Sequence, residues 1–122
     1  MNFSNDRPIY IQLLDKLQFL IVSGNIKIGE RMPSVRDLAL EYKVNPNTVQ
    51  KALQELENLN LIYTERTSGK FVTSDKKLIE KYKIKFALEK VDNYFKSMNE
   101  LGFSEIEALN YMKGDKNEFI RM

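Results

Sequence analysis

The chain has 122 residues, a formal net charge of +2 and a hydrophobic share of 43%, which favours one small folded domain with or without an appendage. It contains no cysteine and no histidine, which excludes disulfides, Cys/His zinc sites and catalytic triads built on either residue. It has neither the basic start and apolar run of a signal peptide nor a run long enough to span a bilayer. We therefore expect a soluble cytoplasmic protein with no membrane partner.

A long helix is predicted from about Arg7 to Gly24, after a largely polar segment, residues 1–6, that is expected to be loose. Proline suits the first turn of a helix, and apolar residues then recur at spacings of three and four: Tyr10, Leu13, Leu14, Leu17, Leu20 and Ile21. This pattern is typical of a helix that packs on a core. In the connector that follows, the alternation of Ile26 and Ile28 allows a very short strand.

Residues 33–58 predict two short helices joined by a tight turn. Ser34 is a good N-cap for the first helix. The turn falls at residues 43–44. Asn45 caps the second helix, and Pro46 occupies its first position, where a missing N–H has no helical partner to lose.

The second of these helices has an apolar and a polar face. The apolar stripe repeats at spacings of three and four: Val49, Ala52, Leu53, Leu56 and Leu59. The other face carries side chains of the kind that reach base edges or phosphates: Asn47, Thr48, Gln50, Lys51 and Gln54. A solvated helix face would look similar, but the two caps, the short turn and the stripe together favour a DNA-binding helix-turn-helix.

A β-hairpin is predicted next. Residues 61–65 and 71–73 are rich in β-branched and aromatic side chains, and a short polar segment separates them. Glycine in such a segment admits positive φ and a close approach to a partner, and two cations flank it. A generic surface hairpin would look similar, but its place after a helix-turn-helix favours a DNA-contacting wing, with candidate contacts at Arg66, Ser68, Gly69 and Lys70.

The remainder of the chain predicts two more helices. The first, over residues 77–101, carries apolar residues at 4-3-4-3 spacing, as in a coiled-coil seam: Ile84, Leu88, Val91, Phe95 and Met98. Ser104 and Glu107 then form a capping box that opens a second helix ending near Gly114.

The apolar side of this last helix includes Ile106 and Leu109. Two helices cannot fully bury broad apolar faces on each other, so the leftover stripe needs a partner. We expect the seam and these two residues to form a homodimer interface. The alternative is that both helices cover the N-terminal core.

Several separated segments, in order and spacing, resemble the GntR family of winged-helix transcription regulators. They are PIYIQLLDKL, SGNIKIGERMPSVRDLA, VNPNTVQKALQELE and SGKFV, all within residues 8–73. The short tail is similar to that of the YtrA-like branch of the family, in which such tails dimerise. The resemblance implies a mainly α fold with a small β-hairpin: a winged helix-turn-helix domain over residues 1–74 and a two-helix dimerisation and effector tail over residues 75–122.

The resemblance also implies DNA contacts at matching positions. They lie in the P-S-x-R segment, at the start of the second helix of the pair and at the wing glycine: Ser34, Arg36, Asn45, Asn47, Thr48, Gln50, Lys51 and Gly69. Two features depart from the family. Thr67 replaces the first glycine of an R-G-x-G wing, which makes the tip stiffer, and Pro46 and Gln50 stand where some members carry arginine. Guanine reading is therefore not expected there, whereas Gln50 suits adenine.

We expect a sequence-specific repressor that binds a pseudo-palindromic operator as a homodimer, with room for a small-molecule effector of unknown identity. The alternative is a winged-helix protein-interaction module without DNA binding, since residues 1–74 hold nine Lys/Arg against eight Asp/Glu. Salt-sensitive binding to duplex DNA separates the two. No paired acid and base, phosphate loop or metal cluster is evident, so we expect no enzyme activity, cofactor or metal.

Overall fold

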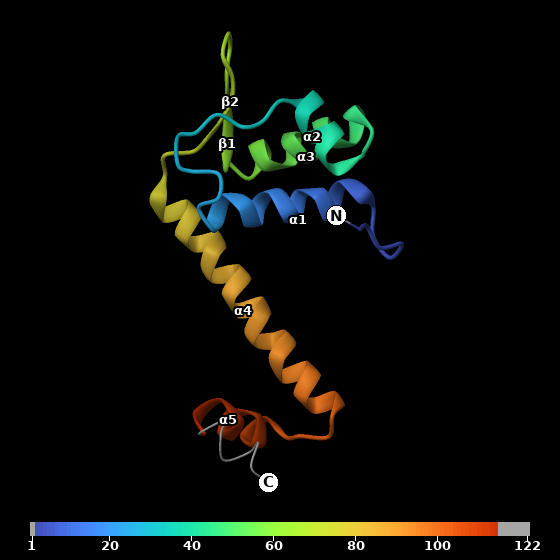
Figure 1. Ribbon diagram of the computed structural model, residues 1–122. Helices are drawn as coiled ribbons and strands as arrows, with labels where there is room; N and C mark the ends of the chain where they lie inside the picture. The colour runs from blue at the N-terminus through green and yellow to red at the C-terminus, as the bar shows by residue number, and fades with distance from the viewer. Residues whose placement is uncertain (1, 115–122) are drawn as a thin grey trace. The chain divides into compact units, whose positions relative to one another are not determined.

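The computed structural model describes residues 2–114, which form five helices and a two-stranded antiparallel sheet (Figure 1). The chain divides into two compact units, the first ending at Lys83 and the second beginning at Ile84. This is the mainly α architecture with a small hairpin that the sequence predicts. In chain order the elements are α1 (Ile9–Val22), α2 (Val35–Tyr42), α3 (Pro46–Asn58), β1 (Ile62–Glu65), β2 (Gly69–Val72), α4 (Lys76–Glu100) and α5 (Glu105–Lys113).

Helix α3 is the centre of the first unit. It packs against α1 and α2 and contacts β1, and it lies directly above α1 in Figure 1. Its buried residues are four of the five in the predicted stripe, since Leu59 is the half-buried C-cap: Val49, Ala52, Leu53 and Leu56. They meet Leu13 and Leu17 of α1 and Leu38 of α2, all nearly inaccessible to solvent, in one apolar core.

Both predicted caps form. The Ser34 hydroxyl oxygen accepts a hydrogen bond from the Asp37 N–H at 3.0 Å, and the Asn45 side-chain oxygen accepts one from the Asn47 N–H at 2.8 Å. Between the two helices, Lys43 closes the turn in the left-handed region at φ 56°. The cap chemistry thus fixes where α2 and α3 begin.

A third, irregular segment pairs with strand β2 of the hairpin. The Val72 N–H donates to the Glu30 carbonyl at 2.9 Å and the Met32 N–H donates to the Lys70 carbonyl at 2.7 Å, which places Arg31 opposite Phe71. The very short strand allowed at residues 26–28 is therefore wrong, because residues 30–32 pair instead. Ile26 is buried against α1, where its N–H donates to the Leu20 carbonyl.

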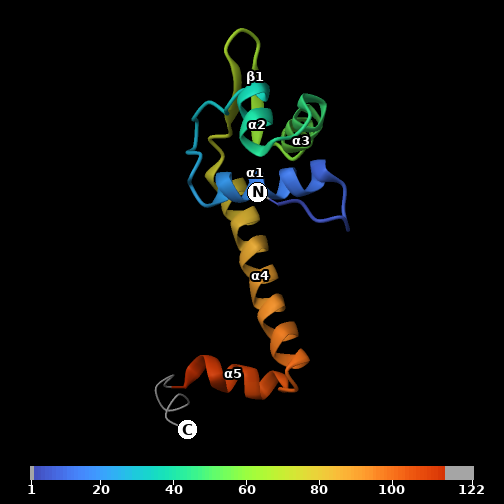
Figure 2. The same cartoon turned by 45° about the vertical axis from the view of Figure 1, so that its right-hand side comes forward.

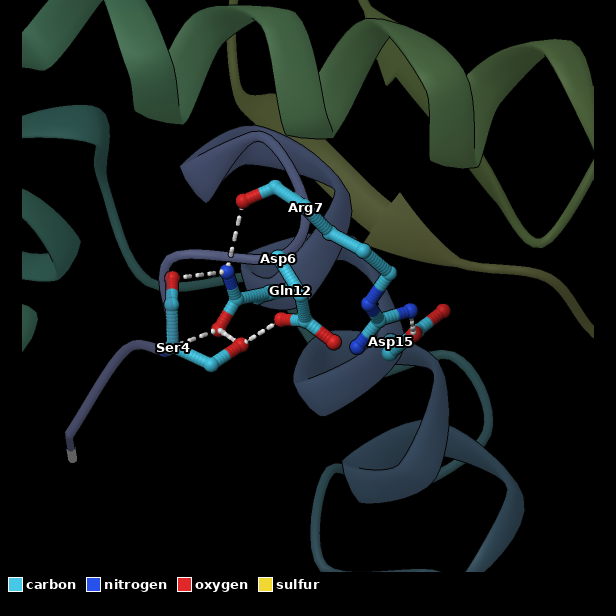
Figure 3. A network of polar contacts seen from close by, with 5 residues as sticks. All are labelled: Ser4, Asp6, Arg7, Gln12 and Asp15. Atoms are coloured by element: carbon cyan, nitrogen blue, oxygen red, sulfur yellow. Dashed lines mark hydrogen bonds and ion pairs between the residues drawn. The ribbon is translucent and has the colours of Figure 1, made fainter.

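The N-terminal segment is held rather than loose. Gln12 of α1 is buried, and its amide donates to the carbonyls of Ser4 at 2.9 Å and Arg7 at 2.8 Å (Figure 3). Its side-chain oxygen accepts from the Ser4 N–H at 2.8 Å, and Asp15 pairs with Arg7 at 2.7 Å. The expectation of a loose start is wrong for Ser4 and Asp6, because the buried amide of Gln12 takes Ser4 as a partner and the Ser4 hydroxyl donates to the Asp6 carboxylate.

The second unit contains most of α4, together with α5. The Tyr94 hydroxyl donates to the Ala108 carbonyl at 2.7 Å, and Ala108 is buried. The predicted capping box opens α5, and the hydrogen bond from the Ser104 N–H lowers the pKa of the Glu107 carboxyl. Because the pKa of Glu107 is lower in the folded state than in the unfolded state, the ionised carboxylate stabilises the fold fully at neutral pH, and this stabilisation is lost on acidification. No helix within residues 2–114 is both long and apolar enough to cross a bilayer.

The burial of α3 generates a first prediction. Leu53→Ala removes a 2% exposed side chain from the α1–α2–α3 core and should lower the free energy of unfolding by about 2–5 kcal/mol. Urea unfolding followed by circular dichroism measures this loss. The neighbouring Gln54→Ala, on the exposed side of the same helix, serves as the control. Equal destabilisation by both substitutions would contradict the assignment of the two faces.

Candidate nucleic-acid interface

The polar face of α3 is turned to solvent. The side chains of Asn47 and Gln50 are exposed and make no hydrogen bond within residues 2–114, whereas Thr48 is half-buried. Gln54 is also exposed and its amide donates to the side-chain oxygen of Asn58 at 3.1 Å. Two amide side chains near the start of α3 are therefore available to an external hydrogen-bonding partner.

The cap residues keep spare donors. The side-chain oxygens of Ser34 and Asn45 accept the cap hydrogen bonds described above, which leaves the Ser34 hydroxyl hydrogen and the Asn45 amide hydrogens free to donate. Both residues are exposed, as is Arg36 in the first turn of α2. These three predicted site residues present donors at the starts of α2 and α3, a chemistry that suits phosphate oxygens.

Lys51 is less free than its exposed position on α3 suggests. Its ammonium lies 4.0 Å from the centre of the Tyr10 ring of α1, a cation–π distance. This contact holds Lys51 on the α1 side of the polar face. The position favours a phosphate contact over a base contact, and no pattern in the sequence pairs Tyr10 with Lys51.

The hairpin projects beyond the helices of its unit (Figures 1 and 2). Arg66 and Ser68 lie in its exposed turn, as predicted for a wing tip. Lys70 does not: it belongs to β2, and its ammonium donates to the Thr64 hydroxyl at 2.8 Å and lies 3.7 Å from the Glu57 carboxylate. Lys70 thus fastens the wing to α3, a role that sequence reasoning missed.

Gly69 also lies in β2, at φ 109°, next to the turn. A Cβ atom at this residue would come within 3.0 Å of the Arg31 side chain. The glycine was predicted as a contact from its backbone freedom, whereas no pattern in the sequence indicates Arg31. Arg31 and Gly69 are brought together by the pairing of residues 30–32 with β2, which is visible only in the folded structure.

Shallow hollows flank these residues. One of about 260 Å³ between α3 and the wing is lined by Val35, Gln50, Leu53, Gln54 and Lys70. It brings two predicted site residues, Gln50 and Lys70, to the same hollow. Among residues 2–114, no three His, Cys, Asp or Glu side chains gather closely enough to hold a metal ion.

The predicted dimer residues lie in the second unit. Of the seam on α4, Ile84, Leu88 and Val91 are exposed by 51%, 62% and 43%, whereas Phe95 and Met98 are half-buried. On α5 the buried residue is Ala108, and the predicted apolar residues are exposed: Ile106 and Leu109. These helices therefore present apolar side chains that the second unit itself does not cover.

Comparison with protein families gives one assignment. The family described as bacterial regulatory proteins of the gntR family matches residues 9–72. An uncharacterized HTH-type transcriptional regulator of Bacillus subtilis, YhcF, is 34% identical over 111 residues, which cover 91% of this chain and 92% of that protein. The HTH-type transcriptional repressor YtrA of the same species is 41% identical over 70 residues, or 57% of this chain and 54% of YtrA.

Solved structures are also similar. A GntR family transcriptional regulator from Listeria monocytogenes superposes with a TM-score of 0.79 at 36% identity, covering 91% of this chain and 97% of that one. The DNA-binding domain of AraR, solved in complex with operator ORX1, gives a TM-score of 0.55 at 25% identity, covering 59% of this chain and 93% of that one.

Proposed function

Because the chain belongs to the gntR family of bacterial regulatory proteins, we propose that this transcriptional regulator represses its target genes as a homodimer bound to operator DNA. The observation that carries the proposal is the polar face of α3. Its Asn47 and Gln50 side chains serve no hydrogen bond of the fold among the described residues, although the opposite face of the same helix is fully buried.

The chemistry divides into positioning and reading. Exposed cations and cap donors suit phosphate oxygens, which set register without carrying sequence information: Ser34, Arg36, Asn45 and Lys51. The amide side chains of Asn47 and Gln50 match the donor and acceptor pattern of adenine in the major groove. The exposed wing turn, with Arg66 and Ser68, reaches the adjacent minor groove.

A homodimer supplies the second reading head. The exposed residues Ile84, Leu88 and Val91 on α4 and Ile106 on α5 are candidates for burial against a second copy of the chain. Two-fold symmetry then places two α3 helices on a pseudo-palindromic site, and two modest half-sites combine into one tight site. The repressor role is supported by the similarity to YtrA, which is a transcriptional repressor.

The test is a titration of the protein against a duplex covering its own promoter region, with a scrambled duplex beside it. Affinity for the promoter should fall steeply with salt, because phosphate contacts release counterions. Arg36→Ala should weaken promoter binding about tenfold and leave the thermal unfolding unchanged, since Arg36 is exposed.

The matched control is Lys27→Ala, which removes an exposed cation from the connector before α2 and should leave binding unchanged. Absence of wild-type binding to either duplex at low salt would overturn the DNA-binding proposal and favour a protein-interaction module. Loss of folding in Arg36→Ala would contradict its surface assignment.

The dimer generates a separate prediction. Leu88→Glu places a charge at the 62% exposed seam position and should convert a dimer into a monomer, because an interface does not tolerate an unpaired buried carboxylate. Sedimentation equilibrium measures the molecular mass of the particle. The control is Glu89→Gln, which changes the adjacent exposed residue. If the wild-type protein sediments as a monomer at the concentrations used for DNA binding, the homodimer proposal is overturned.

A small-molecule effector would act on the second unit. A hollow of about 370 Å³ near the α4–α5 connection is lined by Phe95, Lys96, Asn99, Glu100 and Glu105. The lining carries two carboxylates against one ammonium, so its net negative charge and the aromatic ring suit an organic cation. Isothermal titration with a panel of organic cations should give heat from at least one compound, and this heat should vanish in Phe95→Ala. If no compound of the panel gives heat, the hypothesis of a cationic effector is overturned.

A further inference from the structure

The two faces of the wing carry different chemistry. On the face toward α3, Lys70 is tied to Thr64 and Glu57, so its charge is already partnered by the fold. On the opposite face, cross-strand pairing aligns Tyr63 with Phe71 and Phe71 with Arg31, because paired residues share a face of the sheet. The Tyr63 and Phe71 rings stack at 5.9 Å. This face therefore ends in a cation at the edge of the sheet.

The Arg31 side chain extends along β2 toward the wing turn. Gly69 precedes Phe71 by two residues and so lies on the same face. A Cβ built on Gly69 would stand 3.0 Å from Nε and 3.2 Å from Nη2 of Arg31. The missing side chain at Gly69 thus leaves the space that the guanidinium occupies, beside the exposed turn that carries Arg66 and Ser68.

The fold gives this guanidinium no counter-charge. Arg31 is exposed, and among residues 2–114 it makes neither a hydrogen bond nor an ion pair. Glu65 pairs with Gly69 across the hairpin but does not bridge to Arg31. The guanidinium of Arg31 has five N–H donors and no anionic partner in the described part of the chain, so it is suited to bind an external anion. Because the side chain already packs on Gly69, it loses less conformational entropy when it binds.

We propose that Arg31 is a further DNA-contacting residue, which extends the grip of the wing along the minor groove, and that Gly69 provides the space its guanidinium needs. This inference rests on the proposed DNA binding. Guanidinium groups bind phosphates bidentately and enter narrow, A·T-rich minor grooves, where the negative potential is enhanced. Arg31 thus joins Arg66 at the wing, while Lys70 holds the wing in place.

The test compares wild type, Arg31→Gln, Arg31→Lys and the control Lys27→Gln on the promoter duplex over a series of KCl concentrations. Arg31→Gln should weaken binding about tenfold and reduce the slope of log affinity against log salt by about one. Arg31→Lys should retain the slope, because it retains the charge. Lys27→Gln, in the same connector but not paired with β2, should match wild type.

The outcomes separate the two proposals. If the wild type binds and Arg31→Gln has the same affinity and the same salt slope, the proposed role of Arg31 is overturned and the proposed function is unaffected. Absence of wild-type binding overturns both. Duplexes with A·T-only or G·C-only flanks identify the contact: a larger loss on A·T flanks indicates the groove, and equal losses indicate phosphate alone.

A double-mutant cycle tests the part played by Gly69. Gly69→Ala should weaken DNA binding in the wild-type background and have a smaller effect in the Arg31→Gln background, because the added methyl group then has no guanidinium to displace. Thermal unfolding of each variant accounts separately for backbone strain at φ 109°. Strictly additive losses would show that Gly69 acts without Arg31, which would overturn the space-filling relation between them.

Discussion

The arrangement of this protein depends on one apolar stripe. Val49, Ala52, Leu53 and Leu56 bury one side of α3 between its neighbours, and each large side chain contributes about 1.5–3 kcal/mol on burial. Because side-chain directions on a helix are fixed relative to one another, burial of this stripe also dictates where Asn47 and Gln50 point. The direction of these two side chains is thus set by the core and not by hydrogen bonds of their own.

Local signals in the sequence predicted most of the fold. The caps at Ser34, Asn45 and Ser104 act within one turn of a helix, and apolar spacing identifies a buried face without knowledge of its partner. Non-local pairings were missed. Residues 30–32 join β2 through backbone hydrogen bonds, and Gln12 holds Ser4 through a buried amide. Neither interaction leaves a periodic trace in the sequence.

The same division holds for the candidate interface. Polar residues at the start of a capped helix were predicted as a set, and all of them except the half-buried Thr48 are exposed on α3. What sequence could not give is which cations the fold already engages. Lys51 lies over Tyr10 and Lys70 is bonded to Thr64, whereas Arg31 has no partner among the described residues. Such differences depend on which strand or helix is adjacent in space.

The independence of the α3 polar face from the folded core has an evolutionary consequence. Since the side chains of Asn47 and Gln50 make no hydrogen bond with the rest of the described chain, a duplicated copy of the gene can acquire new side chains there without loss of folding stability. Asn45 and Lys70 are different, because each also holds part of the fold together. Paralogues that diverge in target should therefore differ first at the two former positions and retain the latter two.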